Sequence, residues 1–229
     1  MGRWALGGVL CLGTFFVAAC GGGSSNNKTT QQVRVVMASP DAPLVDIVID
    51  GDQVATSLAY TNFTPYERVT VGQHRVEAVR VSDLASIFQQ TVVVTASSNL
   101  TVLVTGPAAR TQGIVLTDAS TTSLTVTPGD GNVRVVNAAQ AMGEADVYIT
   151  NAGAGLNGAT PVQSSLRFNQ TTGYERTAIG NYEVFMTAPG TTNAFLDTGP
   201  LSLLQSQFQT VVAVEGTRGG FTYIPLTDQ

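Results

Sequence analysis

The chain has 229 residues, which is enough for one large domain or two small ones. Hydrophobic residues make up 43% and charged residues 12%, a balance that can fill a core and excludes a disordered chain. The formal net charge is −5, and every acidic residue lies at or after Asp41. The arginines are scattered singly, which excludes the clustered basic face of a duplex nucleic-acid binder.

The N-terminus has the pattern of an exported, lipid-anchored protein. Arg3 precedes an apolar run over residues 4–17, which is too short to cross a bilayer comfortably. The run ends in Val17-Ala18-Ala19-Cys20, which resembles the lipobox of bacterial lipoproteins. This resemblance implies a signal peptide over residues 1–19 and a thioether-linked lipid on Cys20, and several acyl chains make such anchoring stable.

The mature chain would begin with a polar tether over residues 20–32. A flexible segment of this length spans on the order of 20 Å. By resemblance, Gly21 after the cysteine indicates the outer membrane of a bacterial cell envelope, on its periplasmic or surface face. Cys11 leaves with the signal peptide, so the mature protein has no second thiol for a disulfide and its fold depends on packing.

An internal duplication divides the rest of the chain. Short motifs recur in the same order, at offsets that grow from 100 to 108 to 110. The matching segments are residues 33–36 with 133–136, 66–68 with 174–176, and 116–118 with 226–228. We therefore predict two domains, over residues 33–118 and 133–229, joined by a linker over residues 119–132.

Both units have the pattern of β-strands. Val45, Ile47 and Ile49 alternate with residues that face the other way, and the Asp50-Gly51 pair signals a hairpin turn. The composition is rich in β-branched residues, which favour strands over helices. We predict an all-β fold of about seven short strands per unit, arranged as antiparallel sandwiches.

The first unit carries a family resemblance. Residues 33–43, VRVVMASPDAP, followed by VDIVIDG over residues 45–51, look like the opening of the domain-of-unknown-function family numbered 4397. The resemblance implies immunoglobulin-like or transthyretin-like sandwiches on a secreted or lipid-anchored bacterial protein, and no established activity. The family's usual histidine is replaced by Met37 in the first unit and by Asn137 in the second.

Residues 39–43, Ser-Pro-Asp-Ala-Pro, form a candidate binding loop or a rigid connection, and we favour the connection because proline fixes φ. The acidic residues Asp41, Asp46, Asp50 and Asp52 suggest calcium. However, Asp46 and Asp50 lie roughly 13 Å apart along one strand, too far to converge on one ion. We predict no metal and no cofactor.

Several charged residues recur in both units. We predict that Arg34 pairs with Asp46, and Arg134 with Asp146, between neighbouring strands. His74 is the only histidine, so a Ser-His-Asp site would have to use it. We expect a surface histidine on a strand instead.

A glycine motif and three sequons carry little information. Residues 153–158 match G-x-G-x-x-G, but a proline and a strand-like run follow where a dinucleotide site needs a helix. We interpret this segment as a loop inserted in the second unit. The N-glycosylation patterns at Asn62, Asn99 and Asn169 are expected to be coincidental in a bacterial lipoprotein.

No catalytic constellation is visible in the sequence. We expect a non-enzymatic envelope protein, anchored to the membrane through Cys20, that binds an unknown protein or glycan or acts as a spacer. The alternative is a carbohydrate-active or peptide-processing enzyme with two carboxylates about 5–9.5 Å apart in a cleft.

Overall fold

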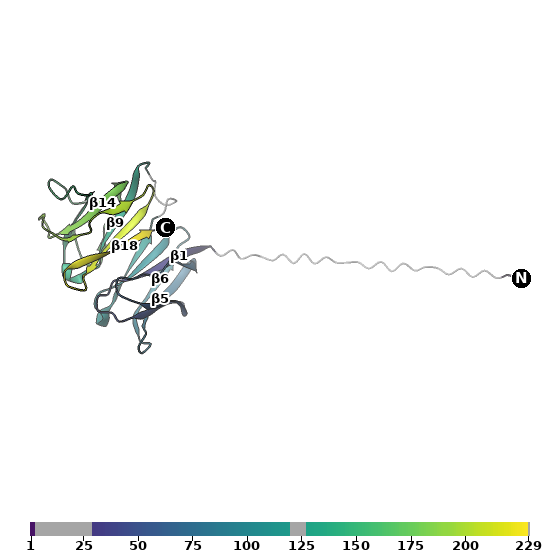
Figure 1. Cartoon of the computed structure of the whole chain (residues 1–229). Helices are drawn as coiled ribbons and strands as arrows, with labels where there is room; N and C mark the ends of the chain where they lie inside the picture. Colours follow the sequence, from purple (N-terminus) through teal and green to yellow (C-terminus); the bar gives the residue numbers. More distant parts are fainter. Residues whose placement is uncertain (3–28, 120–126, 229) are drawn as a thin grey trace.

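The computed structural model describes residues 1–2, 29–119 and 127–228. Residues 3–28, which include most of the predicted signal peptide, Cys20 and the tether up to residue 28, lie outside these residues. Figure 1 shows two β domains side by side, with the first strand following the N-terminal segment. Within the described part of the chain, no helix is long and apolar enough to cross a membrane.

Domain 1 has eight described strands in two sheets. The strands are β1 (Thr30–Met37), β2 (Val45–Ile49), β3 (Asp52–Leu58), β4 (Glu67–Thr70), β5 (Gly72–Arg80), β6 (Ser86–Val94), β7 (Asn99–Thr105) and β8 (Gln112–Asp118). One sheet, which we call the inner sheet because it faces the other domain, has the order β4-β1-β7-β8. The other, which we call the outer sheet, has the order β3-β2-β5-β6. A short 3₁₀ helix, η1 (Ala108–Arg110), joins β7 to β8.

Domain 2 repeats this plan with ten described strands. The elements are β9 (Asp130–Asn137), η2 (Gln140–Met142), β10 (Ala145–Asn151), β11 (Gln163–Leu166), β12 (Gln170–Thr171), β13 (Glu175–Ala178), β14 (Gly180–Thr187), β15 (Ala194–Asp197), β16 (Leu201–Leu203), β17 (Phe208–Glu215) and β18 (Phe221–Asp228). Its inner sheet runs β12-β9-β17-β18, with β13 also paired to β9. Its outer sheet runs β11-β10-β14-β15, with β16 paired to β14.

The structure confirms the predicted all-β sandwiches. It adds one feature that the patterns did not predict, a parallel strand pair in each inner sheet. β1 pairs with β7 in parallel, and β9 pairs with β17 in the same way. The other described strand pairs are antiparallel. Because paired strands run together, β1 and β7 end at the same edge of domain 1, and β9 and β17 at the same edge of domain 2.

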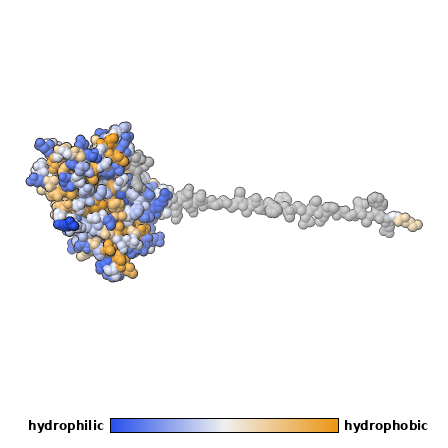
Figure 2. Space-filling model, viewed as in Figure 1, coloured by the Kyte–Doolittle hydropathy of each residue, from blue (hydrophilic) through white to orange (hydrophobic). Residues whose placement is uncertain are grey.

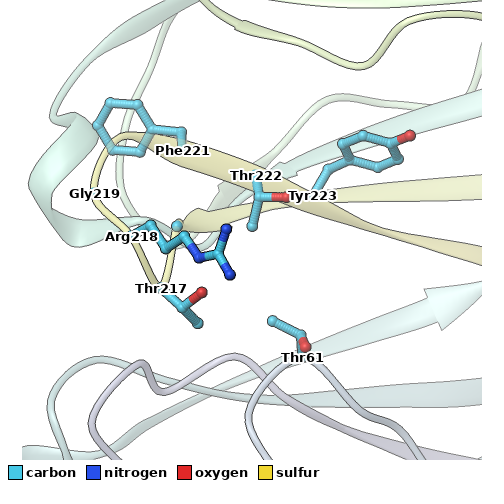
Figure 3. A pocket seen from close by; sticks show the side chains of 8 residues that line it. Thr61, Thr217, Arg218, Gly219, Phe221, Thr222 and Tyr223 are labelled. Atoms are coloured by element: carbon cyan, nitrogen blue, oxygen red, sulfur yellow. The ribbon is translucent and has the colours of Figure 1, made fainter.

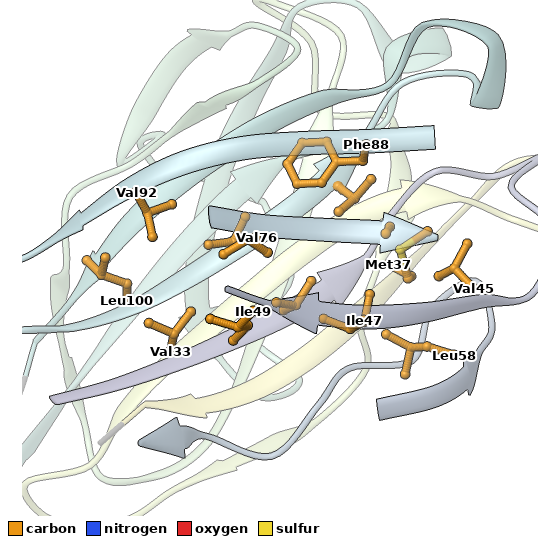
Figure 4. Close-up of a cluster of buried hydrophobic side chains, with 14 of the residues drawn as sticks. Val33, Met37, Val45, Ile47, Ile49, Leu58, Val76, Phe88, Val92 and Leu100 are labelled. Carbon is orange, nitrogen blue, oxygen red and sulfur yellow. The ribbon is translucent and has the colours of Figure 1, made fainter. Parts of the chain in front are cut away.

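Alternation along the strands builds a core inside each sandwich. Val33 and Met37 of β1 pack with Ile47 and Val76 of the outer sheet, all almost fully buried (Figure 4). Val35 of β1 belongs to the same cluster. An equivalent cluster fills domain 2 around Tyr182.

The two inner sheets also pack against each other. Their opposite faces form a third apolar cluster, drawn from both domains: Val36, Ala38, Leu103, Leu116, Val136, Ala138, Val212, Val214, Ile224 and Leu226. The molecule is therefore a stack of four sheets, with β1, β7, β9 and β17 covered on both faces. On the face shown in Figure 2, hydrophobic residues are interspersed with hydrophilic ones over both domains.

Two strand boundaries differ from the predicted domain limits. β1 begins at Thr30, inside the predicted tether, and β9 begins at Asp130, inside the predicted linker. The loop predicted around the glycine motif lies between β10 and β11, over residues 152–162. The equivalent strands of domain 1 are joined by only Asp50 and Gly51, which accounts for most of the extra length of domain 2.

Candidate functional site

Two arginines and two aspartates cross between the domains at the centre of the interface. Arg34 of domain 1 pairs with Asp228 of domain 2, Nη2 to Oδ1, at 2.6 Å. Arg134 of domain 2 pairs with Asp118 of domain 1 at 2.7 Å. The aspartate side chains are fully buried and the arginine side chains are 3% and 5% exposed. We call these four residues the crossed Arg–Asp cluster.

Hydroxyl groups complete the cluster in each domain. Thr101 accepts from Arg34 Nη2 at 2.9 Å and donates to Asp118 Oδ2 at 2.6 Å. Tyr66 donates to the same carboxylate oxygen at 2.8 Å, and its ring centroid lies 4.5 Å from the Arg34 guanidinium carbon. Thr210 and Tyr174 repeat these contacts in domain 2, around Arg134 and Asp228. Every charge is thereby both paired and hydrogen-bonded, which buried ions require.

Burial sets the protonation behaviour of the cluster. Desolvation, followed by the nearby negative charge of Asp228, raises the pKa of Asp118, while Arg134 and Thr101 act in the opposite direction. Burial also raises the pKa of Tyr66 and of Tyr174. Both phenols therefore stay neutral and keep the proton that they donate to the carboxylates.

The predicted Arg34–Asp46 and Arg134–Asp146 pairs are wrong. Arg34 lies on the inner sheet and Asp46 on β2 of the outer sheet, so the two are not on neighbouring strands. The partner of each arginine is instead the aspartate that ends the last strand of the opposite domain. The duplication contains the information needed to find these partners, because Asp118 and Asp228 recur at equivalent positions, as Arg34 and Arg134 do.

Asp46 and Asp146 share a different structural role. Asp46 Oδ1 accepts from the Ser57 amide, and Asp146 Oδ1 from the Ser165 amide, each at 2.9 Å. Both serines have a φ of 50°, and the strand register shifts beside both aspartates. The carboxylate therefore holds a β-bulge in each domain, which explains its recurrence.

His74 is buried, contrary to the predicted surface position, with 7% exposure. Its Nδ1 contacts Asp50 Oδ2 and its Nε2 donates to the Thr70 carbonyl, both at 2.6 Å. Asp50 also accepts from the Arg75 amide at 2.8 Å. The ring nitrogen that would take a proton from a serine thus faces a backbone carbonyl, and the geometry is not that of a Ser-His-Asp site.

A groove opens between the domains at the ends of the parallel strand pairs. Its lining comes from four segments: Pro40 and Asp41 after β1, Gly106 and Pro107 after β7, Gln140 and Ala141 after β9, and Glu215 at the end of β17. We call it the loop groove; its volume is about 510 Å³. It contains the predicted loop of residues 39–43, which here meets its counterpart from domain 2.

The loop groove combines apolar walls with two carboxylates. Asp41 Oδ1 accepts from the Ala108 amide at 2.7 Å, which fixes the loop, and Glu215 Oε1 accepts from the Ala141 amide at 3.0 Å. Two buried oxygens in these segments, Ser39 Oγ and Glu215 Oε2, have no hydrogen-bond partner among the described residues.

The acidic residues considered for calcium lie apart. Asp41 holds η1, Asp46 holds the bulge, and Asp50 pairs with His74. Among the described residues, no three histidine, cysteine, aspartate or glutamate side chains are grouped as a metal site. Cys20, the predicted lipid attachment, lies outside these residues.

Comparison with known proteins places this architecture in a family. The family model "Domain of unknown function (DUF4397)" matches residues 31–148 and 131–229, so the chain belongs to that family and carries two tandem copies. The family resemblance that the opening motif suggested is thereby confirmed. A comparison with curated proteins found no match.

Eleven chains among the solved structures match this chain. One is described as "The Bacillus anthracis TIE protein", with 9% identity and a TM-score of 0.25. The match covers 80% of this chain, which spans only 33% of that one. A score this low carries no argument about function.

Removing one arginine of the cluster tests its energetic role. Arg34→Met leaves buried Asp228 with only the longer contact to Arg134, at 3.6 Å, and we expect a loss of about 3–5 kcal/mol in the free energy of unfolding, measured with urea. Arg134→Met should cause a loss at least as large, because Arg134 contacts both aspartates. Arg167→Met is the matched control, since the Arg167–Glu144 pair is exposed and worth about 1 kcal/mol or less. Equal small losses in all three variants would contradict this account.

The surroundings of Asp50 predict that the stability of the fold depends on pH. Hydrogen bonds from the Arg75 amide and from His74 hold the pKa of Asp50 below its ordinary value of 3.8. A depressed carboxyl pKa gives stability that is complete above pH 3.8 and is lost as pH falls through the folded-state pKa. Asp50→Asn should lower stability at neutral pH and flatten the acid limb below pH 4. An unchanged acid limb in unfolding free energies measured from pH 2 to 7 would refute the assignment.

Proposed function

We propose that this protein is a lipid-anchored, non-enzymatic protein of the bacterial cell envelope that binds a protein or glycan partner in the loop groove. The resemblance of residues 17–20 to a lipobox supports the anchor, and the apolar run before it supports export. The observation that carries the binding function is the groove itself, which neither domain could form alone.

The position of the groove fits presentation away from a membrane. The chain enters the fold at Thr30, the start of β1, whereas the groove follows the opposite end of β1, after Met37. Eight residues of strand span about 25 Å. A tether leading to Cys20 would therefore hold the groove on the side farthest from the lipid, with residues available from both domains.

The enzymatic alternative has less support. A two-carboxylate mechanism needs one carboxyl group with a raised pKa in an open cleft. The raised pKa belongs to Asp118, whose side chain is fully buried and already accepts from Arg134, Thr101 and Tyr66. Asp41 and Glu215 line the groove, but one carboxylate oxygen of each accepts a hydrogen bond from a backbone amide.

A pull-down from envelope extract tests the proposal, using residues 29–229 as bait without Cys20. Ala141→Trp should fill the groove and abolish capture of the specific partner, whereas Ala178→Trp, on the exposed edge strand β13, should leave capture intact. Unfolding curves confirm that both variants stay folded. Capture that survives Ala141→Trp, or a hydrolytic activity that this variant abolishes, would refute binding without turnover.

A further inference from the structure

A second pocket lies at the turn of the β17–β18 hairpin. Its lining combines Thr61 of domain 1 with Gly216, Thr217, Arg218, Gly219, Phe221, Thr222 and Tyr223 of domain 2, and its volume is about 380 Å³. Figure 3 shows the Arg218 guanidinium projecting between Thr222 and Thr61. We call it the Arg218 pocket. It shares no residue with the loop groove, so a ligand site here can be tested independently of the function proposed for the loop groove.

Three donor side chains of this pocket have no partner within the protein. Among the described residues, Arg218, which is exposed, has no ion pair, hydrogen bond or ring contact, and the hydroxyls of Thr217 and Thr222 have no hydrogen-bond partner. The other two lining hydroxyls are engaged, because Thr61 donates to the Tyr60 carbonyl and Tyr223 to the Thr198 carbonyl. The nearest acidic residue in sequence, Glu215, directs its carboxylate to the Ala141 amide in the loop groove. An arginine presents five N–H donors and no acceptor, and the hydroxyls add further donors.

The duplication shows that this pocket is an opening specific to one half of the interface. Thr61 corresponds to Asn169 at the offset of 108, and Thr222 corresponds to Gln112 at the offset of 110. In the other half, the Asn169 amide donates to Gln112 Oε1 at 2.6 Å and accepts from the Thr105 hydroxyl at 2.8 Å, which bridges the domains. Threonine at 61 is too short to make that bridge, and the space beside it stays open.

Backbone strain at Thr61 supports a functional reason for the exchange. Thr61 has a φ of 68° and Asn169 a φ of 63°. Asparagine tolerates this left-handed conformation, whereas a β-branched threonine does not and is strained there. The Thr61 amide donates to the Met37 carbonyl at 2.8 Å, and the neighbouring Tyr60 hydroxyl donates to the Glu215 carbonyl at 2.6 Å, so the strained turn is held against the hairpin.

From this combination we propose that the Arg218 pocket binds an oxyanion group, as carried by an acidic saccharide. Arg218 pairs with the carboxylate or sulfate in the two-pronged geometry that guanidinium favours. The hydroxyls of Thr217 and Thr222 contact the anion and the sugar hydroxyls beside it. The volume of the pocket, about 380 Å³, is large enough for one sugar residue of a longer chain.

Titrations of the two-domain fragment, residues 29–229, test the site with defined probes. We expect saturable binding of a galacturonic acid trimer, seen as amide shifts at Thr61 and Thr222, and no binding of the neutral galactose trimer. Inorganic phosphate is a separate arm. Phosphate that binds as tightly as the acid trimer would support the oxyanion site and identify a free ion as its occupant. No shift with either anion would overturn the proposal.

Variants separate the site from general electrostatics and from misfolding. Arg218→Gln should weaken binding of the acid trimer by roughly tenfold or more, whereas Arg110→Gln, an equal charge change on η1 outside the pocket, should not. Thr61→Asn copies the closed half, so it should weaken binding while raising stability. Equal weakening by Arg218→Gln and Arg110→Gln, or Thr61→Asn binding at the wild-type level, would overturn the proposal.

Discussion

The arrangement of this molecule depends on two buried ion pairs that cross between its domains. Each arginine emerges from the first strand of one domain and meets the aspartate that ends the last strand of the other. An ion that stays buried without its partner costs several kcal/mol, so the two domains dock only in the arrangement that pairs all four charges. The apolar cluster around the ion pairs supplies the buried hydrophobic area of the interface. The charges determine how the two inner sheets are aligned with each other.

This exchange makes the two domains resemble the subunits of a symmetric dimer joined into one chain. The equivalent contacts of Tyr66 and Tyr174 follow the same two-fold relation. Departures from it are then informative, because duplication supplies the expected arrangement for each position. The bridge at Asn169 and the opening at Thr61 are such a departure. The loop groove, by contrast, uses corresponding segments of both domains.

The sequence predicts the local structure well and the interface poorly, for physical reasons. Alternation in 45–49 places Val45, Ile47 and Ile49 inside, as observed. The same alternation puts Arg34 on the opposite face from Val33 and Val35, but its partner lies 194 residues away and in another domain. A short-range sequence pattern cannot show which distant acidic residue an arginine contacts. The prediction that Arg34 pairs with the nearer Asp46 is therefore wrong.

Burial of polar residues was equally invisible. His74 sits beside a turn, where exposure is the usual expectation, yet Asp50 and the Thr70 carbonyl satisfy both ring nitrogens inside the fold. The prolines of residues 39–43 predict a rigid connection, and the Asp41–Ala108 hydrogen bond ties this loop to η1. Its place in a groove depends on the docking of two domains, which strand patterns do not encode.

The central claim is that the crossed cluster makes the two domains one cooperative unit. Differential scanning calorimetry of residues 29–229 tests it most directly, because the ratio of the calorimetric to the van't Hoff enthalpy counts the units that unfold together. We expect a single transition with a ratio near one. Two transitions, or a ratio near two, would show that the domains unfold independently and would contradict the account.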